Sequence, residues 1–248
     1  KTAYEIYQCD WSSDVCSSDL GVSWLSLTGV SETAARLLKG DDANYKVRFV
    51  PNANYNGTAT FTFRAWDQTS GTAGQTADVT TNGGTTAFSG TTATASVTVT
   101  SVNDSPVAAN AALTAIDEDV TSANNAGTLV SALVSGCTDA DSNAVKGLAV
   151  VAVDEANGKW YYTVDAGVSW LSLTGVSPTA ARLLKGNDAN YKVRFVPNAN
   201  YNGTATFTFR AWDQTSGTAG QTADVTTNGG STAFSGLTAT ASITINSI

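Results

Sequence analysis

The sequence of 248 residues contains no histidine and no methionine, and only 14% of its residues are charged. Without histidine, the chain lacks the side chain that serves most often as a general base and as a metal ligand. It also shows no pairing of a nucleophile with a base, no zinc-ligand spacing and no phosphate-binding glycine loop. We therefore expect that the protein is not an enzyme.

Basic residues are also scarce, since Lys and Arg number 13 against 21 Asp and Glu, and the formal net charge is −8. Nucleic acids and anionic membranes bind clusters of Lys and Arg. We therefore expect no nucleic-acid partner and a preference for cations. No apolar run approaches the roughly 18 residues of a membrane helix, so we expect no membrane span in this fragment.

Cysteine occurs three times, and two copies, Cys9 and Cys16, lie in the first twenty residues. Cys137 has no partner within its repeat, and we expect it to be a small buried apolar residue. The residues that replace charge are Thr, Ala, Ser, Gly and Asn, which is typical of extracellular β-repeats. Because the chain begins at Lys1 and has no methionine, we expect an internal fragment of a longer protein.

The most informative feature that is present is a repeat. Residues 21–102 recur at 167–248, offset by 146 positions without a gap. A period of this size is that of a domain rather than of a solenoid. We therefore interpret 21–102 as the C-terminal part of a truncated repeat and 103–248 as a complete one. The copies differ only at Glu32/Pro178, Asp41/Asn187, Thr85/Ser231, Thr91/Leu237, Val97/Ile243, Val99/Ile245, Thr100/Asn246 and Val102/Ile248.

Residues 1–20 break the repeat. They should match 147–166, but only Ala3 and Asp19 agree with their counterparts. A fall from near identity to none at one residue indicates a junction, and CDWSSDVCSSDL resembles translated sequencing-adapter sequence. We predict that residues 1–20 are a non-native segment, the alternative being a real variant segment.

Alternation of apolar and polar residues predicts strands in the complete repeat. Thr204–Trp212 and Thr238–Ile245 alternate throughout, as do residues 191–195. Leu148–Val153 and Lys159–Val164 flank Asn157-Gly158, which is a hairpin signal. Seven to nine strands in a repeat of this length indicate an all-β, antiparallel β-sandwich of the cadherin or immunoglobulin type, in tandem units. Further predicted strands are Leu113–Ile116, Thr128–Val134 and Val168–Leu173.

Two further segments are less regular. Thr179–Lys185 reads equally as a short helix or a strand, and Thr215–Phe234 reads as a long polar loop or a strand excursion. The first repeat lacks its opening strands, so its sandwich cannot close. We predict that 21–102 alone is unstable and exposes apolar strand edges.

Short acidic or amide motifs stand at the predicted strand ends. In an antiparallel sandwich, alternate strand ends lie at the same pole, so side chains from several motifs can meet there. Calcium takes six to eight oxygen ligands from carboxylates, amides and carbonyls. The candidate ligands are Asn103, Asp104, Asp139, Asp141, Asp213 and Glu118.

These motifs, read in order, resemble a known family. VNDSPV at the junction, DEDVT, TDADS, FVPNANYNGTATFTF, RAWD and ASITI are similar to bacterial cadherin-like repeats, which grade into VCBS repeats, of very large secreted or cell-surface proteins. The resemblance covers 103–248 and 21–102. It implies sandwiches of about seven strands that bind calcium at the joints between neighbouring repeats.

The resemblance also implies roles for the candidate ligands. Asn103 and Asp104 correspond to linker ligands, Asp139 and Asp141 to a D-x-D pair, and Asp213 to the aspartate that closes an A-x-D turn. Glu118 resembles a glutamate that serves the joint at the far end, beyond Ile248.

Two positions depart from the family pattern. Ser101 stands where the linker has its first acid, and Asn200 stands approximately where a glutamate is expected. We therefore expect fewer ions per joint and a weak affinity, of about 10⁻⁴–10⁻³ M. An isolated D-x-D or N-D is often turn chemistry rather than a metal site, and that reading stays open.

These observations predict an extracellular structural repeat of a bacterial surface or secreted adhesin, in which calcium-stiffened joints make a stalk. The alternative is a repeat that itself binds glycan or a surface protein through multivalency. In that reading, Trp24/Trp170 and Trp66/Trp212 are possible sugar-stacking platforms, although tryptophans of this kind are usually half-buried in the sandwich.

Overall fold

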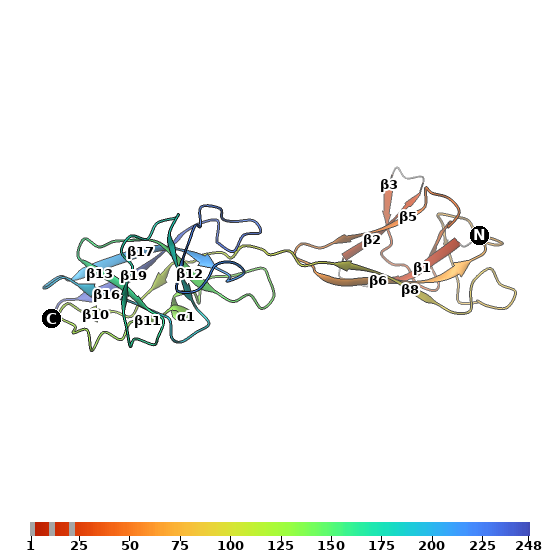
Figure 1. Ribbon diagram of the computed structural model, residues 1–248. Helices are drawn as coiled ribbons and strands as arrows, with labels where there is room; N and C mark the ends of the chain where they lie inside the picture. Colours follow the sequence, from red (N-terminus) through yellow and green to blue (C-terminus); the bar gives the residue numbers. More distant parts are fainter. Residues whose placement is uncertain (1–2, 10–12, 20–22) are drawn as a thin grey trace. The chain divides into compact units, whose positions relative to one another are not determined.

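The computed structural model describes residues 3–9, 13–19 and 23–248. The chain divides into two compact units, Lys1–Ser101 (unit 1) and Val102–Ile248 (unit 2). Each unit is built from β-strands, and unit 2 also contains α1 (Val130–Leu133), a helix of four residues (Figure 1). No helix among the described residues has the length and apolarity needed to cross a membrane.

Unit 2 consists of two sheets. The large sheet has the order β10 (Ile116–Asp117), β19 (Ala239–Asn246), β17 (Gly203–Trp212), β12 (Gly147–Val153), β15 (Ala181–Lys185) and β18 (Thr222–Ala223), with β9 (Ala111–Ala112) also paired to β19. The small sheet has the order β11 (Thr128–Leu129), β16 (Lys192–Pro197), β13 (Gly158–Thr163) and β14 (Leu171–Ser172). All pairs are antiparallel except those of β9 and β10 with β19.

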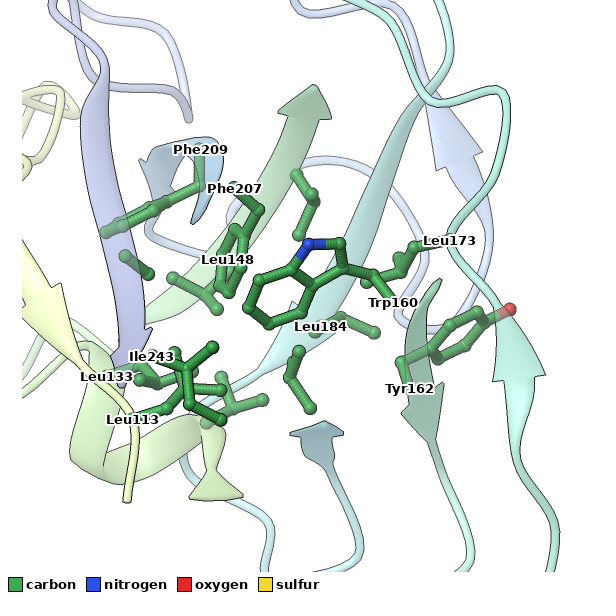
Figure 2. Packing of buried hydrophobic residues seen from close by; sticks show 14 of the residues in the cluster. Leu113, Leu133, Leu148, Trp160, Tyr162, Leu173, Leu184, Phe207, Phe209 and Ile243 are labelled. Atoms are coloured by element: carbon green, nitrogen blue, oxygen red, sulfur yellow. The ribbon is translucent and has the colours of Figure 1, made fainter. Parts of the chain in front are cut away.

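The core of unit 2 lies between the two sheets. Trp160 of the small sheet contacts Phe195 beside it and Phe207 of the large sheet, each with ring centroids 5.0 Å apart. Figure 2 shows the Trp160 indole surrounded by Phe207, Leu148 and Leu184. Because alternate residues of each strand face this layer, the burial follows the period of two that the sequence shows. The predicted antiparallel sandwich is confirmed.

A second, smaller core covers the outer face of the large sheet. The segment from Thr215 to Phe234 folds back over that face and packs Val225 and Phe234 against Trp212, all of them buried. The Trp212 indole Nε1 donates a hydrogen bond to Ser216 O at 2.7 Å. The predicted polar loop therefore covers the outer face of the large sheet and buries apolar side chains of its own, Val225 and Phe234, against it.

The predicted hairpin at Asn157-Gly158 is wrong, because β12 and β13 belong to different sheets. β12 already has β15 and β17 as neighbours, so it has no open edge for β13. Gly158 is required for another reason. A Cβ on this residue would collide with the Phe195 ring and with Val196 O of the neighbouring strand.

Three predicted segments are corrected by the structure. Thr128–Val134 is not one strand, because β11 is followed by α1, whose Val130 and Leu133 both reach the core one helical turn apart. Leu113–Ile116 and Val168–Leu173 contain strand only at Ile116 and at Leu171–Ser172. The ambiguous Thr179–Lys185 contains β15, which is a strand. Cys137 is buried as expected.

Unit 1 repeats this layout with fewer strands. Its larger sheet has the order β7 (Thr76–Ala77), β4 (Ala35–Leu38), β1 (Ala3–Cys9), β6 (Gly57–Trp66) and β8 (Ala93–Val99). Its smaller sheet has the order β3 (Ser23–Ser26), β2 (Ser13–Asp19) and β5 (Lys46–Pro51).

The segment 1–20 supplies β1 and β2, although residues 1–2, 10–12 and 20 lie outside the described residues. β1 pairs with β4 and β6 as β12 pairs with β15 and β17. Ala3 stands opposite Trp66, and Gly147 opposite Trp212. That residues 1–20 are non-native stays a prediction, because backbone pairing of this kind accepts many sequences.

Apolar residues are exposed on the outermost strands of unit 1 even with β1 and β2 in place, whereas the instability predicted for residues 21–102 alone stays a prediction. Val47 of β5 is 38% exposed and Val97 of β8 is 44% exposed. Their counterparts in unit 2, Val193 and Ile243, are 0% and 2% exposed. β5 and β8 each end a sheet in unit 1, whereas β16 and β19 are flanked by β11, β9 and β10 in unit 2.

Candidate functional site

The candidate site lies where the chain enters unit 2. Residues 103–107 run along the body of the unit, and Val107 forms a two-way backbone pair with Thr138, with N–O distances of 2.8 and 3.1 Å. Ser105 N donates to Gly230 O at 2.7 Å. The entering segment is therefore held against two loops, 138–141 and 230–232, each of which follows or precedes a core strand.

The loop at 138–141 presents two carboxylates. Asp141 N donates to Asp139 Oδ1 at 2.9 Å. This bond closes a turn in which an aspartate side chain accepts a hydrogen bond from the backbone two residues later. Asp104 N donates to Asp141 Oδ2 at 2.8 Å. The D-x-D loop thus binds the backbone of the entering segment through one carboxylate and shapes itself through the other.

Asp213 comes from the end of β17 and is only 3% exposed. Its Oδ1 accepts hydrogen bonds from Thr215 N at 2.8 Å and Thr215 Oγ1 at 2.6 Å. Its Oδ2 accepts a hydrogen bond from Asn103 Nδ2 at 2.8 Å. The same amide nitrogen lies 3.4 Å from Thr232 O. The Asn103 amide is therefore enclosed by oxygen atoms.

Asp139 is the electrostatic centre of the group. Burial raises its pKa above the ordinary value of 3.8, and the charges of Asp141, Asp213 and Asp104 raise it further. The hydrogen bond from Asp141 N opposes this rise. Asp139 Oδ2 is buried without a hydrogen-bond partner. An unpaired buried carboxylate oxygen carries a desolvation cost that a cation would relieve.

Five of the six predicted ligands therefore converge, namely Asn103, Asp104, Asp139, Asp141 and Asp213. The backbone N–H groups of Asp104 and Asp141 already bind two of these carboxylates. The carboxylate and amide oxygens of the group are of the type that a hard cation prefers. In the described ranges, no group of three or more His, Cys, Asp or Glu side chains already has the arrangement that could hold a metal ion.

Glu118 lies elsewhere in unit 2, beside the end of β19. Its backbone N donates to Asn246 O at 3.0 Å. Its side chain accepts hydrogen bonds from Asn202 Nδ2 at 3.2 Å and from Ile248 N at 3.3 Å. Asp117 accepts from Asn246 Nδ2 at 3.3 Å. Glu118 therefore belongs to the end at which the chain leaves the unit.

The sequence reading missed the partners that hold the site. Thr215 fixes one face of Asp213, and the 230–232 loop supplies backbone oxygens. The sequence does indicate the Thr215 contact, because the D-x-T pattern recurs with the same hydrogen bond at Asp67, Asp78 and Asp224. No sequence pattern indicates the contact of the 230–232 loop with Asn103, since the two are more than a hundred residues apart in the chain.

The tryptophans proposed as sugar platforms are covered. Trp66 and Trp212 are 2% and 1% exposed and belong to the outer-face cores. The guanidinium carbon of Arg194 lies 4.1 Å from the centroid of the Trp170 ring, and that of Arg48 lies 4.2 Å from the Trp24 ring. Arginine stacking of this kind occupies one face of each of these half-buried rings.

Comparison with known proteins finds a similarity to one family model in part of the chain. Residues 9–80, within unit 1, match the family model described as a bacterial Ig domain. None of the curated proteins compared with the chain matches it. Human mucin-like protocadherin EC1-2 is 9% identical over 97% of this chain and 87% of that chain, with a TM-score of 0.41. The CupB6 tip adhesin from Pseudomonas aeruginosa is 7% identical over 100% of this chain and 86% of that chain, with a TM-score of 0.29.

Proposed function

We propose that unit 2 is a spacer repeat of a bacterial surface or secreted adhesin-like protein, and that Ca²⁺ stiffens the joint at which the chain enters it. One observation carries the proposal. Asp104, Asp141 and Asp213 lie close enough to Asp139 to raise its pKa, around a buried carboxylate oxygen that has no hydrogen-bond partner.

The residues present fit the chemistry of calcium. Asp139, Asp141 and Asp213 would supply carboxylate oxygens, and the entering segment would add the Asp104 side chain and the Asn103 amide oxygen. The ion would supply the positive charge that offsets the mutual repulsion of these groups. The amide nitrogen of Asn103 donates a hydrogen bond to Asp213, which attaches the entering segment to the body of the unit.

The mechanism of stiffening is electrostatic. Asn103 and Asp104 belong to the linker, whereas Asp139, Asp141 and Asp213 belong to the body of the unit. A cation held by both sets would have to be released before the linker could detach. With uncompensated carboxylates, repulsion opposes the hydrogen bonds of Asn103 and Asp104. The linker would then bend more readily, and the array would project a distal module less rigidly.

Glu118 would serve the opposite end in the same way, where it contacts Ile248 N. The partners in this proposal are neighbouring repeats of the same chain. The proposed location is the extracellular surface or the medium, and no reaction is catalysed.

The alternative function, multivalent binding of glycan or a surface protein, has less support. Its candidate contact residues were Trp24, Trp66, Trp170 and Trp212, which are buried or stacked by arginine. Binding of a single isolated unit 2 on a glycan array, without any effect of Ca²⁺ on stability, would favour this alternative.

Thermal melts of residues 102–248 in EDTA and in a Ca²⁺ titration test the proposal. A ligand that binds only the folded state, present at a free concentration of tenfold its Kd, adds about 1.4 kcal/mol to the free energy of unfolding. For a domain of this size we expect Tm to rise by roughly 3–5 °C. The rise should saturate, and Asp213→Ala should abolish it. An equal shift with Mg²⁺, or a flat response at 10 mM Ca²⁺ (about tenfold the weakest expected Kd), would argue against the proposal.

A further inference from the structure

The pair Asn157-Gly158 is one of five Asn-Gly pairs in the chain, and the structure gives it no hairpin to form. An Asn-Gly pair can modify itself, because glycine has no Cβ to obstruct the approach of its backbone nitrogen to Cγ of the asparagine. Whether it does so depends on how firmly the fold holds the asparagine amide and the glycine N–H. The other pairs are Asn56-Gly57, Asn82-Gly83, Asn202-Gly203 and Asn228-Gly229.

The pair at 228–229 shows what firm holding looks like. Asn228 Nδ2 donates to Val225 O at 3.1 Å and to Thr226 O at 2.8 Å. Gly229 N donates to Phe234 O at 2.8 Å. An attack of the glycine nitrogen on the side chain would have to break all these hydrogen bonds, so the fold protects this pair.

The same kind of holding occurs at two further pairs. Asn82 Nδ2 donates to Val79 O at 3.0 Å and to Thr80 O at 3.1 Å. Asn202 Nδ2 donates to Glu118 Oε2 at 3.2 Å. In each case the asparagine amide is fixed by an acceptor, so its reaction with the next residue is opposed.

Asn157 is held more loosely. Its side chain is exposed, and it makes no hydrogen bond to any of the residues that the structure describes. Asn198 N donates to Asn157 O at 2.8 Å. Because bonded and non-bonded pairs alternate along an antiparallel ladder, the next pair, Gly158 with Pro197, exchanges no bond. Gly158 N therefore points away from β16, and it has no hydrogen-bond partner in the described part of the chain.

We propose that Asn157 is a site of spontaneous deamidation, at which the chain converts its own asparagine to isoaspartate and aspartate. Gly158 N forms a bond to Asn157 Cγ, and its proton goes to the side-chain nitrogen, which leaves as ammonia. Water then opens the resulting succinimide ring at either of its carbonyl carbons. One opening gives aspartate, and the other gives isoaspartate, in which the main chain runs through Cβ and Cγ. Water is the only co-reactant.

The modification falls at the crossing between the two sheets. Residues 154–157 join β12 of the large sheet to β13 of the small sheet. Trp160 Nε1 donates to Asp154 O at 2.9 Å, so this loop also holds the central indole of the core. Gly158 is packed so closely that a Cβ on it would collide with the Phe195 ring. Isoaspartate adds an atom to the main chain between these two anchors, and we expect it to lower the Tm of unit 2.

The test compares conversion in the folded chain with conversion in the chain unfolded by urea. The full chain is incubated at mildly alkaline pH, digested with trypsin and analysed by liquid chromatography and mass spectrometry. Residues 147–159 form one tryptic peptide and residues 211–248 another, and neither peptide occurs in unit 1. Fragment spectra locate the modified residue within each peptide.

The unfolded rate divided by the folded rate gives the protection of each pair and removes the effect of local sequence. We expect the protection of Asn228 to exceed that of Asn157 at least about tenfold, since the hydrogen bonds at 228–229 must break first. Equal protection of the two residues would overturn the proposal. So would a folded chain in which 147–159 stays unmodified while the unfolded chain converts.

Asn157→Gln is the matched control, because glutamine keeps the amide on an exposed side chain but would have to close a larger ring. After the same incubation, the variant should show no modification in 147–159, and its unit 2 should keep its Tm. In the native chain, a lower-melting population of unit 2 should grow with the modified fraction. A fall in Tm that the variant shares would show that the modification of Asn157 is not its cause.

Discussion

Asp139 is the residue on which the candidate site depends most. It donates no hydrogen bond while ionised, one of its oxygens closes the turn to Asp141, and the other is buried without a partner. A carboxylate in this position is costly to the folded state unless it is protonated or paired with a cation. Replacing Asp139 is therefore expected to have opposite effects on stability with and without calcium.

We expect Asp139→Asn to raise the Tm of unit 2 in EDTA by a few degrees and to abolish the calcium-dependent rise. The amide keeps an oxygen for Asp141 N but removes one of the repelling charges. A change of about 1 kcal/mol corresponds to roughly 2–4 °C for a domain of this size. Thermal melts with and without Ca²⁺ check both the higher Tm in EDTA and the loss of the calcium-dependent rise.

The control for this variant is Asp119→Asn, which removes the same charge from an exposed position away from the site. The pH dependence is a further check. Because folding raises the pKa of Asp139, the folded state binds its proton more tightly, and this residue adds stability as pH falls through its folded pKa toward 3.8. Asp139→Asn should remove that increment. A variant that loses stability in EDTA would contradict the electrostatic account.

The pKa of Asp165 is shifted in the opposite direction to that of Asp139. Hydrogen bonds from Ser169 and Thr163 hold its pKa well below the ordinary value. Its contribution to stability is therefore present above the unfolded pKa and is lost as pH falls further. The two aspartates illustrate that neighbours decide the sign, because both are ordinary loop residues in sequence.

At the scale of elements, the cover formed by residues 215–234 joins the large sheet through a few buried side chains. Phe234 is 6% exposed and packs with Trp212 and Val225. Phe234 also bonds through its backbone to Gly229 N at 2.8 Å. The segment is polar over most of its length, and it is also attached through its backbone, because β18 pairs with β15 and Asp213 N donates to Ala233 O.

We expect Phe234→Ala to lower the free energy of unfolding of unit 2 by about 3 kcal/mol, since the change leaves a cavity in the outer-face core. Urea denaturation of residues 102–248 checks the value. Leu237→Thr is the matched control, because Leu237 is 82% exposed and Thr91 occupies this position in unit 1. Similar losses for both variants would show that the cover is not anchored at Phe234.

At the scale of the whole molecule, two units with nearly the same sequence differ in how far their cores are closed. In the backbone pairing, Val15 stands opposite Phe49 where unit 2 has Trp160 opposite Phe195, so a residue type with a smaller side chain occupies this strand position in unit 1. Val47 and Val97 of unit 1 also leave apolar surface in water that their counterparts in unit 2 bury. Both differences reduce the burial that stabilises a sandwich.

We expect the full chain to unfold in two steps, with unit 1 melting at least about 10 °C below unit 2, since loss of several kcal/mol of burial shifts Tm by that order. Hydrogen exchange at rising temperature checks this, with 91–102 reporting on unit 1 and 237–248 on unit 2. One cooperative transition seen by both segments would contradict it.

Residue patterns alone predicted the strands of the sandwich and the acids at their ends. Alternation in Thr204–Trp212 identified β17, because a period of two puts the apolar side chains of a strand on one face whatever its neighbours are. Strand-end positions predicted that the acids meet the junction residues, and Asp141 and Asp213 do bond to Asp104 N and to Asn103 Nδ2. The calcium that they would bind stays a prediction.

Only the tertiary structure decided which sheet each strand joins and how deeply it is buried. The Asn157-Gly158 pair has the local signature of a hairpin, yet β12 and β13 part because β15 and β17 take both edges of β12. The sequence KVRFVP is buried in β16 and exposed in β5, since burial depends on residues 107–134, which are distant along the chain. Local sequence determines the period of a strand, whereas contacts across the chain determine its partners and its exposure to water.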